Sequence, residues 1–216
     1  MKKASERIEL VPEATSHRLS LLLRALRGLE STGVHTASSY EIAARFGLNS
    51  AQIRKDLAQF GEFGVRGVGY RVHELKRHLR ALMGLEKTRA VGIAGAGNLG
   101  QALADSRNFN AEGFRVAALF DLDGRKVGGR SRTGIPIRDV STLEESVAEL
   151  HIEIGILAVP AEGAIPLAQR MAAAGVGALL NFAPVTVPAL PGLLVKNVDL
   201  TFFLENLSFQ LAMTKA

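Results

Sequence analysis

The feature that most constrains this chain is the segment Ala90–Gly100, in which small and β-branched residues lead into a Gly-x-Gly-x-x-Gly pattern. A helix-like segment, Leu99–Asp105, follows at once. In this setting Gly95 permits a tight turn, Gly97 lets a pyrophosphate approach the backbone, and Gly100 lets the helix pack close to the strand. The pattern therefore predicts a Rossmann-type βαβ unit with a phosphate site at the helix N-terminus.

A second predicted strand, Arg115–Asp121, ends in a carboxylate about 20 residues beyond the glycines, where such units hold the diol of a ribose. A carboxylate at this point would repel the additional 2′-phosphate of NADP. We therefore expect NAD and NADH as the ligands. A βαβ unit that binds no dinucleotide is the alternative.

Strand and helix patterns alternate through the remainder of the C-terminal half, which predicts a doubly wound parallel sheet. The strands are expected at 135–137, 154–159, 177–181 and 193–198, with helices at 141–150, opened by a capping box at Ser141–Glu144, and up to Ala174. Ligands bind such sheets at the carboxyl ends of the strands. The expected cofactor-binding residues are Gly95, Ala96, Gly97, Asn98, Leu99, Gly100, Asp121, Val159, Pro160, Ala161, Phe182, Ala183 and Pro184.

The charge of +5 is unevenly distributed. Residues 1–89 hold 16 Lys and Arg against 9 Asp and Glu, whereas residues 90–216 hold 10 against 12. The basic part suggests a polyanionic partner, the alternative being a solvated basic face without one. The chain has no cysteine, which excludes disulfides and zinc–thiolate sites. It shows no signal-type or membrane-length apolar run, so we expect a cytoplasmic protein without a membrane partner.

The basic part has the pattern of a helix-turn-helix. A leucine-striped helix is expected from Ala14, capped by Thr15 or Ser16. The two helices of the motif are expected at 38–46, stopped by Gly47, and from a cap at Asn49 or Ser50 to Phe60, with a fourth helix at 72–83. A small helical scaffold or a dimerisation domain is the alternative.

The third helix is expected to turn Ile53, Leu57 and Phe60 inward and to expose amides and a lysine, side chains that read base edges in a major groove. Arg54 lies on the flank, where it suits a phosphate. The glycine-spaced segment 63–70 is expected to form a wing tipped by an arginine. The expected DNA-binding residues are Ser50, Gln52, Arg54, Lys55, Gln59, Arg66, Gly69 and Tyr70.

The terminal segment 199–213 has apolar residues around most of a helix, Phe203 and Leu207 among them. A helix that is apolar on several sides must be covered on several sides, and insertion into a second subunit would achieve this. The segment therefore predicts a homodimer. Packing within its own domain is the alternative.

Groups suited to catalysis are missing from the expected crevice. None of the five histidines falls in the crevice segments, and Glu162 suits a helix N-terminus better than a catalytic base. No metal-ligand spacing occurs, and we expect neither a metal nor enzyme activity. An NAD-dependent oxidoreductase with an accessory basic domain and a coenzyme A-responsive DNA-binding regulator are the rival functions.

The chain resembles the Rex family of redox-sensing transcriptional repressors over nearly its whole length. The motifs that carry the resemblance are Arg54–Leu57, Phe60–Gly64, Arg66–Tyr70, Gly95–Gly100, Phe120–Asp121, Val159–Ala161, Asn181–Pro184 and Asn197–Leu200. The family commonly carries an aromatic residue just after the dinucleotide helix, where this chain has Ser106–Phe109.

The resemblance implies a fold of class α/β: a winged helix-turn-helix at 1–84, a Rossmann-like doubly wound parallel sheet at 85–198 and a swapped terminal helix at 199–216. It also implies a homodimer that represses respiratory or fermentative genes until NADH accumulates. An apolar pocket would disfavour the cationic nicotinamide of NAD⁺ by desolvation. NADH would then alter the spacing of two heads on a palindromic operator in double-stranded DNA, with Arg18 and Asp199 as an intersubunit latch.

Overall fold

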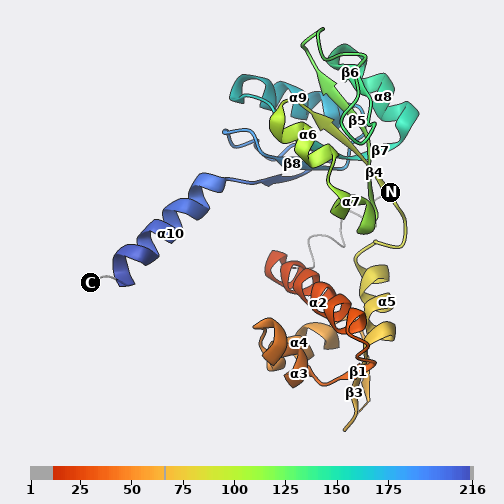
Figure 1. Ribbon diagram of the computed structural model, residues 1–216, viewed down its shortest axis with the longest axis vertical. Coiled ribbons are helices and arrows are strands. Elements are labelled where there is room, and N and C mark those ends of the chain that lie inside the picture. Colours follow the sequence, from red (N-terminus) through yellow and green to blue (C-terminus); the bar gives the residue numbers. More distant parts are fainter. Residues whose placement is uncertain (1–11, 66, 215–216) are drawn as a thin grey trace. The chain divides into compact units, whose positions relative to one another are not determined.

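The computed structural model describes residues 12–65 and 67–214, in two compact units, Met1–Glu86 and Lys87–Ala216. The terminal helix is grouped with the second unit (Figure 1). The boundary at residue 86 falls in the glycine-containing segment that follows the fourth helix of the first unit.

The first unit is a winged helix. Its helices are α2 (Glu13–Ser31), α3 (Ser39–Phe46), α4 (Ser50–Ala58) and α5 (Val72–Leu82), and its strands are β1 (Thr36–Ala37), β2 (Gly64–Val65) and β3 (Gly69–Arg71). The strands form an antiparallel sheet in the order β1-β3-β2. Strand β1 was not predicted from the sequence, because two residues are too few for a recognisable pattern.

Local signals define the helix-turn-helix as predicted. Ser38 forms a capping box with Glu41 at the start of α3, and Gly47 ends that helix in the left-handed conformation. Asn49, rather than Ser50, caps α4 by accepting the N–H of Gln52. The cap predicted for α2 was wrong: neither Thr15 nor Ser16 caps the helix, which begins at Glu13, one residue before the expected start at Ala14.

The second unit contains a six-stranded parallel sheet. The strands are β4 (Arg89–Ala94), β5 (Phe114–Asp121), β6 (Ile137–Asp139), β7 (Ile152–Leu157), β8 (Ala178–Asn181) and β9 (Leu194–Asn197). Their order, β6-β5-β4-β7-β8-β9, places the third, second and first strands on one side and the fourth to sixth on the other. This is the Rossmann order, and it reverses between β4 and β7.

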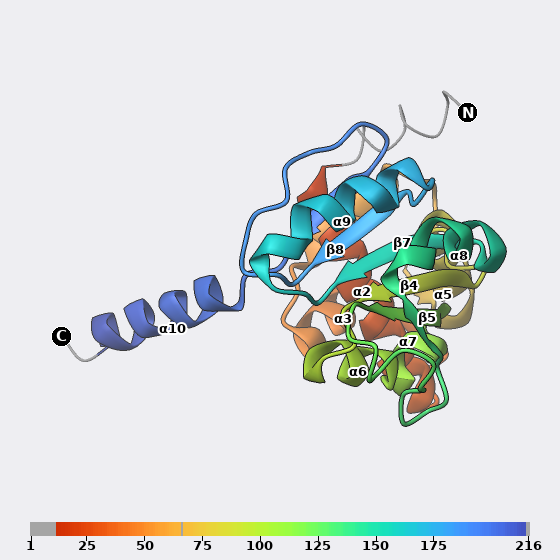
Figure 2. The same ribbon diagram turned by 90° about the horizontal axis from the view of Figure 1, so that it is seen from above.

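Helices cover both faces of this sheet (Figure 2). One face packs on α8 (Leu143–Leu150) and α9 (Ala161–Ala173), and the other on α6 (Asn98–Ala104) and α7 (Arg107–Ala111). The strands bury both faces, as in β4, where Ala94 belongs to the first core and Ile93 to the second. The α/β fold class is therefore confirmed.

Two local predictions in this unit need correction. The expected capping box at Ser141–Glu144 is absent: Asp139 caps a short 3₁₀ helix, η1 (Val140–Thr142), and α8 follows directly. Glu144 instead forms an ion pair with Arg170 of α9. Helix α7 was not predicted.

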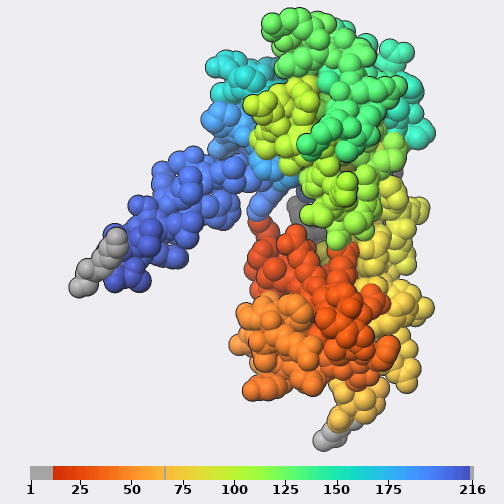
Figure 3. All heavy atoms as spheres, in the orientation of Figure 1, coloured from red at the N-terminus to blue at the C-terminus, as the bar shows by residue number. Residues whose placement is uncertain are grey.

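The terminal helix α10 (Leu200–Thr214) has no buried residue. Figure 3 shows its side chains, in dark blue, uncovered on the face in view. Its apolar side chains, Phe203 and Leu207 among them, are more than half exposed. Within the described part of the chain, no helix combines the length and the apolar character that a membrane crossing requires.

Candidate dinucleotide site and DNA-binding surface

Two of the three glycines in the turn between β4 and α6 are required by the close approach of neighbouring backbone atoms. Gly95 has φ +99°, and a Cβ there would lie 2.2 Å from the carbonyl oxygen of Ala158. A Cβ on Gly100 would lie 1.8 Å from the carbonyl oxygen of Gly95, so only glycine permits this approach of helix to turn. A Cβ on Gly97 would meet no atom within 4 Å, and Gly97 lines an open crevice.

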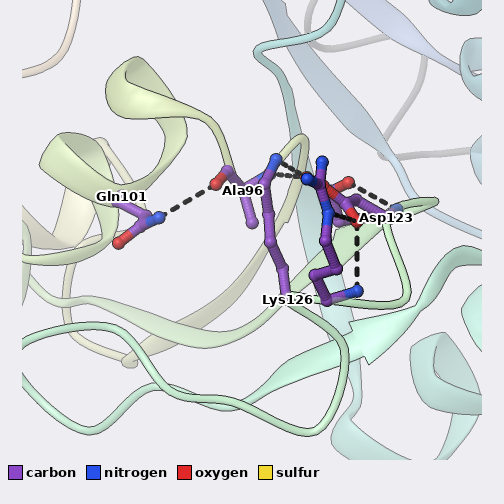
Figure 4. A network of polar contacts seen from close by, with 6 residues as sticks. Ala96, Gln101, Asp123 and Lys126 are labelled. Atoms are coloured by element: carbon purple, nitrogen blue, oxygen red, sulfur yellow. Dashed lines mark hydrogen bonds and ion pairs between the residues drawn. The ribbon is translucent and has the colours of Figure 1, made fainter.

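Asp121, at the end of β5, is hydrogen-bonded to this turn. Figure 4 shows the surrounding network of polar contacts, with Ala96, Asp123 and Lys126 labelled. Its Oδ2 accepts the backbone N–H of Ala96 at 2.8 Å and the ammonium of Lys126 at 3.1 Å. Its Oδ1 accepts the backbone N–H of Asp123 at 2.9 Å. Burial alone would raise the pKa of Asp121, but these hydrogen bonds outweigh it and lower the pKa, so the group is an anion at neutral pH.

The crevice has a volume of about 520 Å³ and lies at the carboxyl ends of β4, β5 and β7, where the strand order reverses. Its walls are mainly apolar, and its ionisable groups are Asp121, Lys126 and Glu162. The lining comprises Gly95, Gly97, Phe120, Asp121, Leu122, Lys126, Val140, Ala158, Val159, Pro160, Glu162, Gly163 and Leu167.

The structure brings only some of the predicted cofactor residues to this lining. Val159 and Pro160 lie on it, whereas Phe182, Ala183 and Pro184 follow β8 and do not. Ala183 is buried, and its N–H is held by Asn181. The remaining predicted residues adjoin the crevice without lining it: Ala96, which is buried, Asn98 and Leu99, which are exposed at the start of α6, Gly100 inside α6, and Ala161 at the start of α9.

These residues fit a dinucleotide. The open space at Gly97 offers a place for phosphate groups, and Asp121 offers acceptors to a ribose. The crevice lining contains no histidine. In the described ranges, no group of three or more His, Asp or Glu residues is placed to hold a metal ion.

The exposed face of α4, with the residue that follows the helix, presents three of the eight residues predicted to contact DNA. Arg54, Lys55 and Gln59 are exposed, and Nη1 of Arg54 donates to Oγ of Ser39 at 2.8 Å. Ser50 is half-buried at the first position of the helix. This surface presents two cations and an amide, which suit the edges and the backbone of a duplex.

Gln52 was expected to be free on this face, but its side chain is engaged within the unit. Its Nε2 donates to Oδ1 of Asp56 at 2.7 Å. Asp56 is 3% exposed and also receives two hydrogen bonds from Arg18 of α2, at 2.5 and 2.8 Å. The sequence did not lead us to predict this role for Asp56, although its position three residues after the inward-facing Ile53 places both on the same face of the helix.

The wing differs from the prediction at Tyr70. Tyr70 is 9% exposed and packs in the core, because β3 is the central strand of the small sheet. At the adjacent Gly69, a Cβ would lie 2.7 Å from the carbonyl oxygen of Ala37. Both residues therefore contribute to the packing of the wing, and their expected contact with DNA stays a prediction. Arg66 lies outside the described residues.

Next to the wing is a hollow of about 460 Å³ that includes the start of α3. Arg54 and Ser39 line it together with the exposed Val65 and Val68, and Tyr70 forms part of its wall.

The predicted dimer residues lie elsewhere. Asp199 caps α10 by accepting the N–H groups of Thr201 and Phe202.

Comparisons with known proteins agree with this architecture. Residues 10–58 match the family described as "Putative DNA-binding protein N-terminus", and residues 86–185 match "CoA binding domain". The redox-sensing transcriptional repressor Rex of Carboxydothermus hydrogenoformans is 46% identical over 93% of this chain and 96% of its own. Rex 1 of Thermotoga maritima is 41% identical over 94% of this chain and 97% of its own.

Solved structures of the protein RSP are also similar to this chain over nearly its whole length. RSP in complex with β-NAD⁺ and operator DNA is similar with a TM-score of 0.89 and 37% identity, covering 95% of this chain and 94% of that one. RSP in complex with β-NADH is similar with a TM-score of 0.84 and 36% identity, covering 95% and 96%.

A winged helix on the same chain as a Rossmann-type unit defines a class of DNA-binding regulators with a nucleotide-type ligand crevice. Full-length similarity specifies the group within that class. The chain belongs to the Rex family of redox-sensing transcriptional repressors.

Proposed function

We propose that this protein binds operator DNA through its winged helix and releases it when NADH occupies the crevice of its Rossmann unit. The observation that carries the proposal is the glycine turn closed by Asp121 on a chain that also contains a helix-turn-helix. The similarity to RSP, which has been solved with β-NAD⁺ and operator DNA and with β-NADH, supports both ligands.

The turn at Gly95–Gly100 and Asp121 would hold the parts that NADH and NAD⁺ share. Discrimination then falls to the apolar part of the crevice, where Val159 and Pro160 lie. An apolar wall disfavours the cationic nicotinamide of NAD⁺ by desolvation. A free-energy difference of about 1.4 kcal/mol changes relative affinity tenfold, so a modest effect suffices for a sensor. Phe182, Ala183 and Pro184 would join this wall only if their segment moved toward it.

DNA would be contacted by α4, with Lys55 and Gln59 toward the bases and Arg54 on the backbone. Ser50 lies at the start of the same helix. Gln52 would read DNA only in the orientation that Asp56 imposes on its amide. Arg66, at the predicted tip of the wing, is proposed to reach the minor groove.

The exposed apolar helix α10 is proposed to dock on a second copy of the chain, which makes a homodimer with two heads for a palindromic operator. Phe203 and Leu207 would be buried there. The latch between Arg18 and Asp199 of the other subunit stays a proposal. Arg18 has a partner in Asp56 within its own subunit, so the latch requires an exchange of partners.

We infer that the protein catalyses no reaction and acts in the cytoplasm. The crevice lining offers Asp121, Lys126 and Glu162 but no histidine, and the relatives are named as repressors. Coenzyme A is the second candidate ligand, because the Rossmann unit matches a family described as binding it.

The test is a mobility-shift titration on palindromic DNA with NADH, NAD⁺, NADPH and coenzyme A. Release by NADH at micromolar concentration, with little release by the other three, is the expected result. Release by coenzyme A alone would support the second candidate. Retention of DNA at every concentration of NADH would contradict the proposed function, and turnover of NADH with a small substrate would support an oxidoreductase.

A further inference from the structure

Lys126 forms an ion pair with Asp121, whose carboxylate a cofactor ribose would need as a hydrogen-bond acceptor. Its Nζ lies 3.1 Å from Oδ2 of Asp121, and its side chain lines the crevice. The lysine side chain is 36% exposed and that of Asp121 is 13% exposed. The charge of Asp121 is therefore partly neutralised before any ligand binds.

The hydrogen bonds of Asp121 show which partner can leave. A carboxylate offers about four acceptor positions. Backbone N–H groups of Ala96 and Asp123 fill two of them from fixed positions, and Lys126 fills a third at the end of a flexible side chain. The two hydroxyls of a ribose need two positions. The lysine and the diol therefore compete for Asp121, and only the lysine can yield.

A lysine that yields remains tethered beside the same carboxylate, because residues 123 and 126 are joined by the backbone hydrogen bond from Lys126 N–H to the carbonyl of Asp123. There its cation counters the repulsion that Asp121 exerts on a phosphate group, and it can donate a charge-assisted hydrogen bond to one. Lys126 thus weakens the preference of Asp121 for a ribose with a free 2′-hydroxyl over a ribose with a 2′-phosphate.

We propose that Lys126 is a specificity-determining residue: it sets how strictly the crevice distinguishes a ribose with a free 2′-hydroxyl from one with a 2′-phosphate. It lowers the affinity for NADH by competing with the diol, and raises the affinity for NADPH by supplying a cation. This inference rests on the proposed binding of NADH in the crevice.

Arg125 provides a matched control from the same loop. Its side chain is 90% exposed, and its guanidinium pairs with the carboxylate of Asp123 rather than with Asp121. Replacement of either residue by methionine removes one positive charge. A general charge effect would change the affinities for NADH and NADPH alike in both variants. Direct competition at Asp121 would change them only in Lys126→Met.

The experiment measures dissociation constants of NADH and NADPH by fluorescence titration of the full chain without DNA. In Lys126→Met the ratio of the NADPH constant to the NADH constant should rise at least about fivefold, the size of one partly exposed ion pair. Lys126→Arg and Arg125→Met should each stay within about threefold of the original protein. Circular dichroism and thermal unfolding check that each variant is folded, and Lys126→Gln replaces Lys126→Met if the latter is not.

The inference is overturned if the ratio of the two dissociation constants rises by less than this in Lys126→Met, or falls. It is also overturned if the ratio rises equally in Arg125→Met. Each of these outcomes leaves NADH binding itself in place. Failure of the unaltered protein to bind NADH at all overturns the proposed function, and the inference with it. The two failures are therefore distinguishable from the same titrations.

Discussion

The guanidinium of Arg18 on α2 donates two hydrogen bonds, of 2.5 and 2.8 Å, to the carboxylate of Asp56 on α4. The pair joins the first helix of the winged unit to the helix expected to enter the major groove. Asp56 is 3% exposed, and the Arg18 hydrogen bond is the largest influence that lowers its pKa. The orientation of α4 thus depends on a charge located on another helix.

Arg18→Met should destabilise the winged unit, because it leaves a buried carboxylate with Gln52 as its remaining side-chain partner. Hydrogen exchange of amides in α2 and α4 measures the effect on this unit separately. Arg71→Met is the control, since the Arg71–Glu74 pair is well exposed and should contribute less than about 1 kcal/mol. Equal protection in both variants would contradict the structural role of the Arg18–Asp56 pair.

The proposed latch between Arg18 and Asp199 of the other subunit can be tested with one substitution in α10. Asp199→Asn removes the carboxylate from α10 and leaves the Arg18–Asp56 pair intact. If the latch forms in one ligand state, this variant shifts the NADH concentration required to release DNA, as measured by mobility shift. An unchanged release curve, with an unchanged dimer, rules the latch out.

Asp105 should produce a pH dependence in the stability of the second unit. Hydrogen bonds from Thr133 and Ser131 lower its pKa to about 2. Because the pKa in the folded chain is below that in the unfolded chain, these contacts stabilise the fold above about pH 4, and the stabilisation is lost as the pH falls toward 2. The thermal midpoint of Asp105→Asn should therefore lie below that of the original protein at pH 7 and approach it near pH 2. An NMR titration giving a pKa of 4 or higher contradicts this.

The glycine turn yields a paired prediction. Gly97→Ala adds a Cβ that meets no protein atom but enters the crevice, so stability should change by less than about 0.5 kcal/mol while NADH binding weakens tenfold or more. Gly100→Ala places a Cβ 1.8 Å from the carbonyl oxygen of Gly95 and should destabilise the unit by about 1–3 kcal/mol or more. Thermal unfolding and NADH titration separate the two effects. Unaltered NADH affinity in Gly97→Ala would place the phosphates elsewhere.

The exposed helix α10 predicts the oligomeric state. Phe203→Asp combined with Leu207→Asp puts two charges on its apolar surface and should convert a dimer into monomers in sedimentation velocity experiments. Glu205→Gln on the same helix exchanges one polar side chain for another and should leave the dimer unchanged. A monomeric starting protein would argue against docking of α10 on a second copy.

Lys55→Gln should weaken DNA binding and reduce the salt dependence of log K by about one unit if the lysine reaches a phosphate. If it reaches a base instead, affinity falls by about 1–3 kcal/mol with a change of sequence preference. Arg24→Gln, an exposed residue of α2 outside the helix-turn-helix, is the control. Similar losses in both variants would indicate a general charge effect.

Much of the fold could be predicted from the sequence because its signals are local. The capping box at Ser38, the stop at Gly47 and the spacing of Gly95, Gly97 and Gly100 each act within a few residues. The alternation of strands with helices likewise predicted the parallel sheet. The capping box expected at Ser141–Glu144 failed because Asp139 offered a competing cap and Arg170 engaged Glu144.

The sequence by itself determined that a basic helix-turn-helix precedes a glycine turn and a strand ending in Asp121, since backbone conformation and hydrophobic periodicity are properties of short segments. Only the tertiary structure decided that Arg18 pairs with Asp56, that Tyr70 lies in the core and that Lys126 pairs with Asp121. Such contacts depend on how separate elements and loops pack in space, as for Arg18 and Asp56, which are 38 residues apart. No periodic pattern in a single segment encodes a pairing of that kind.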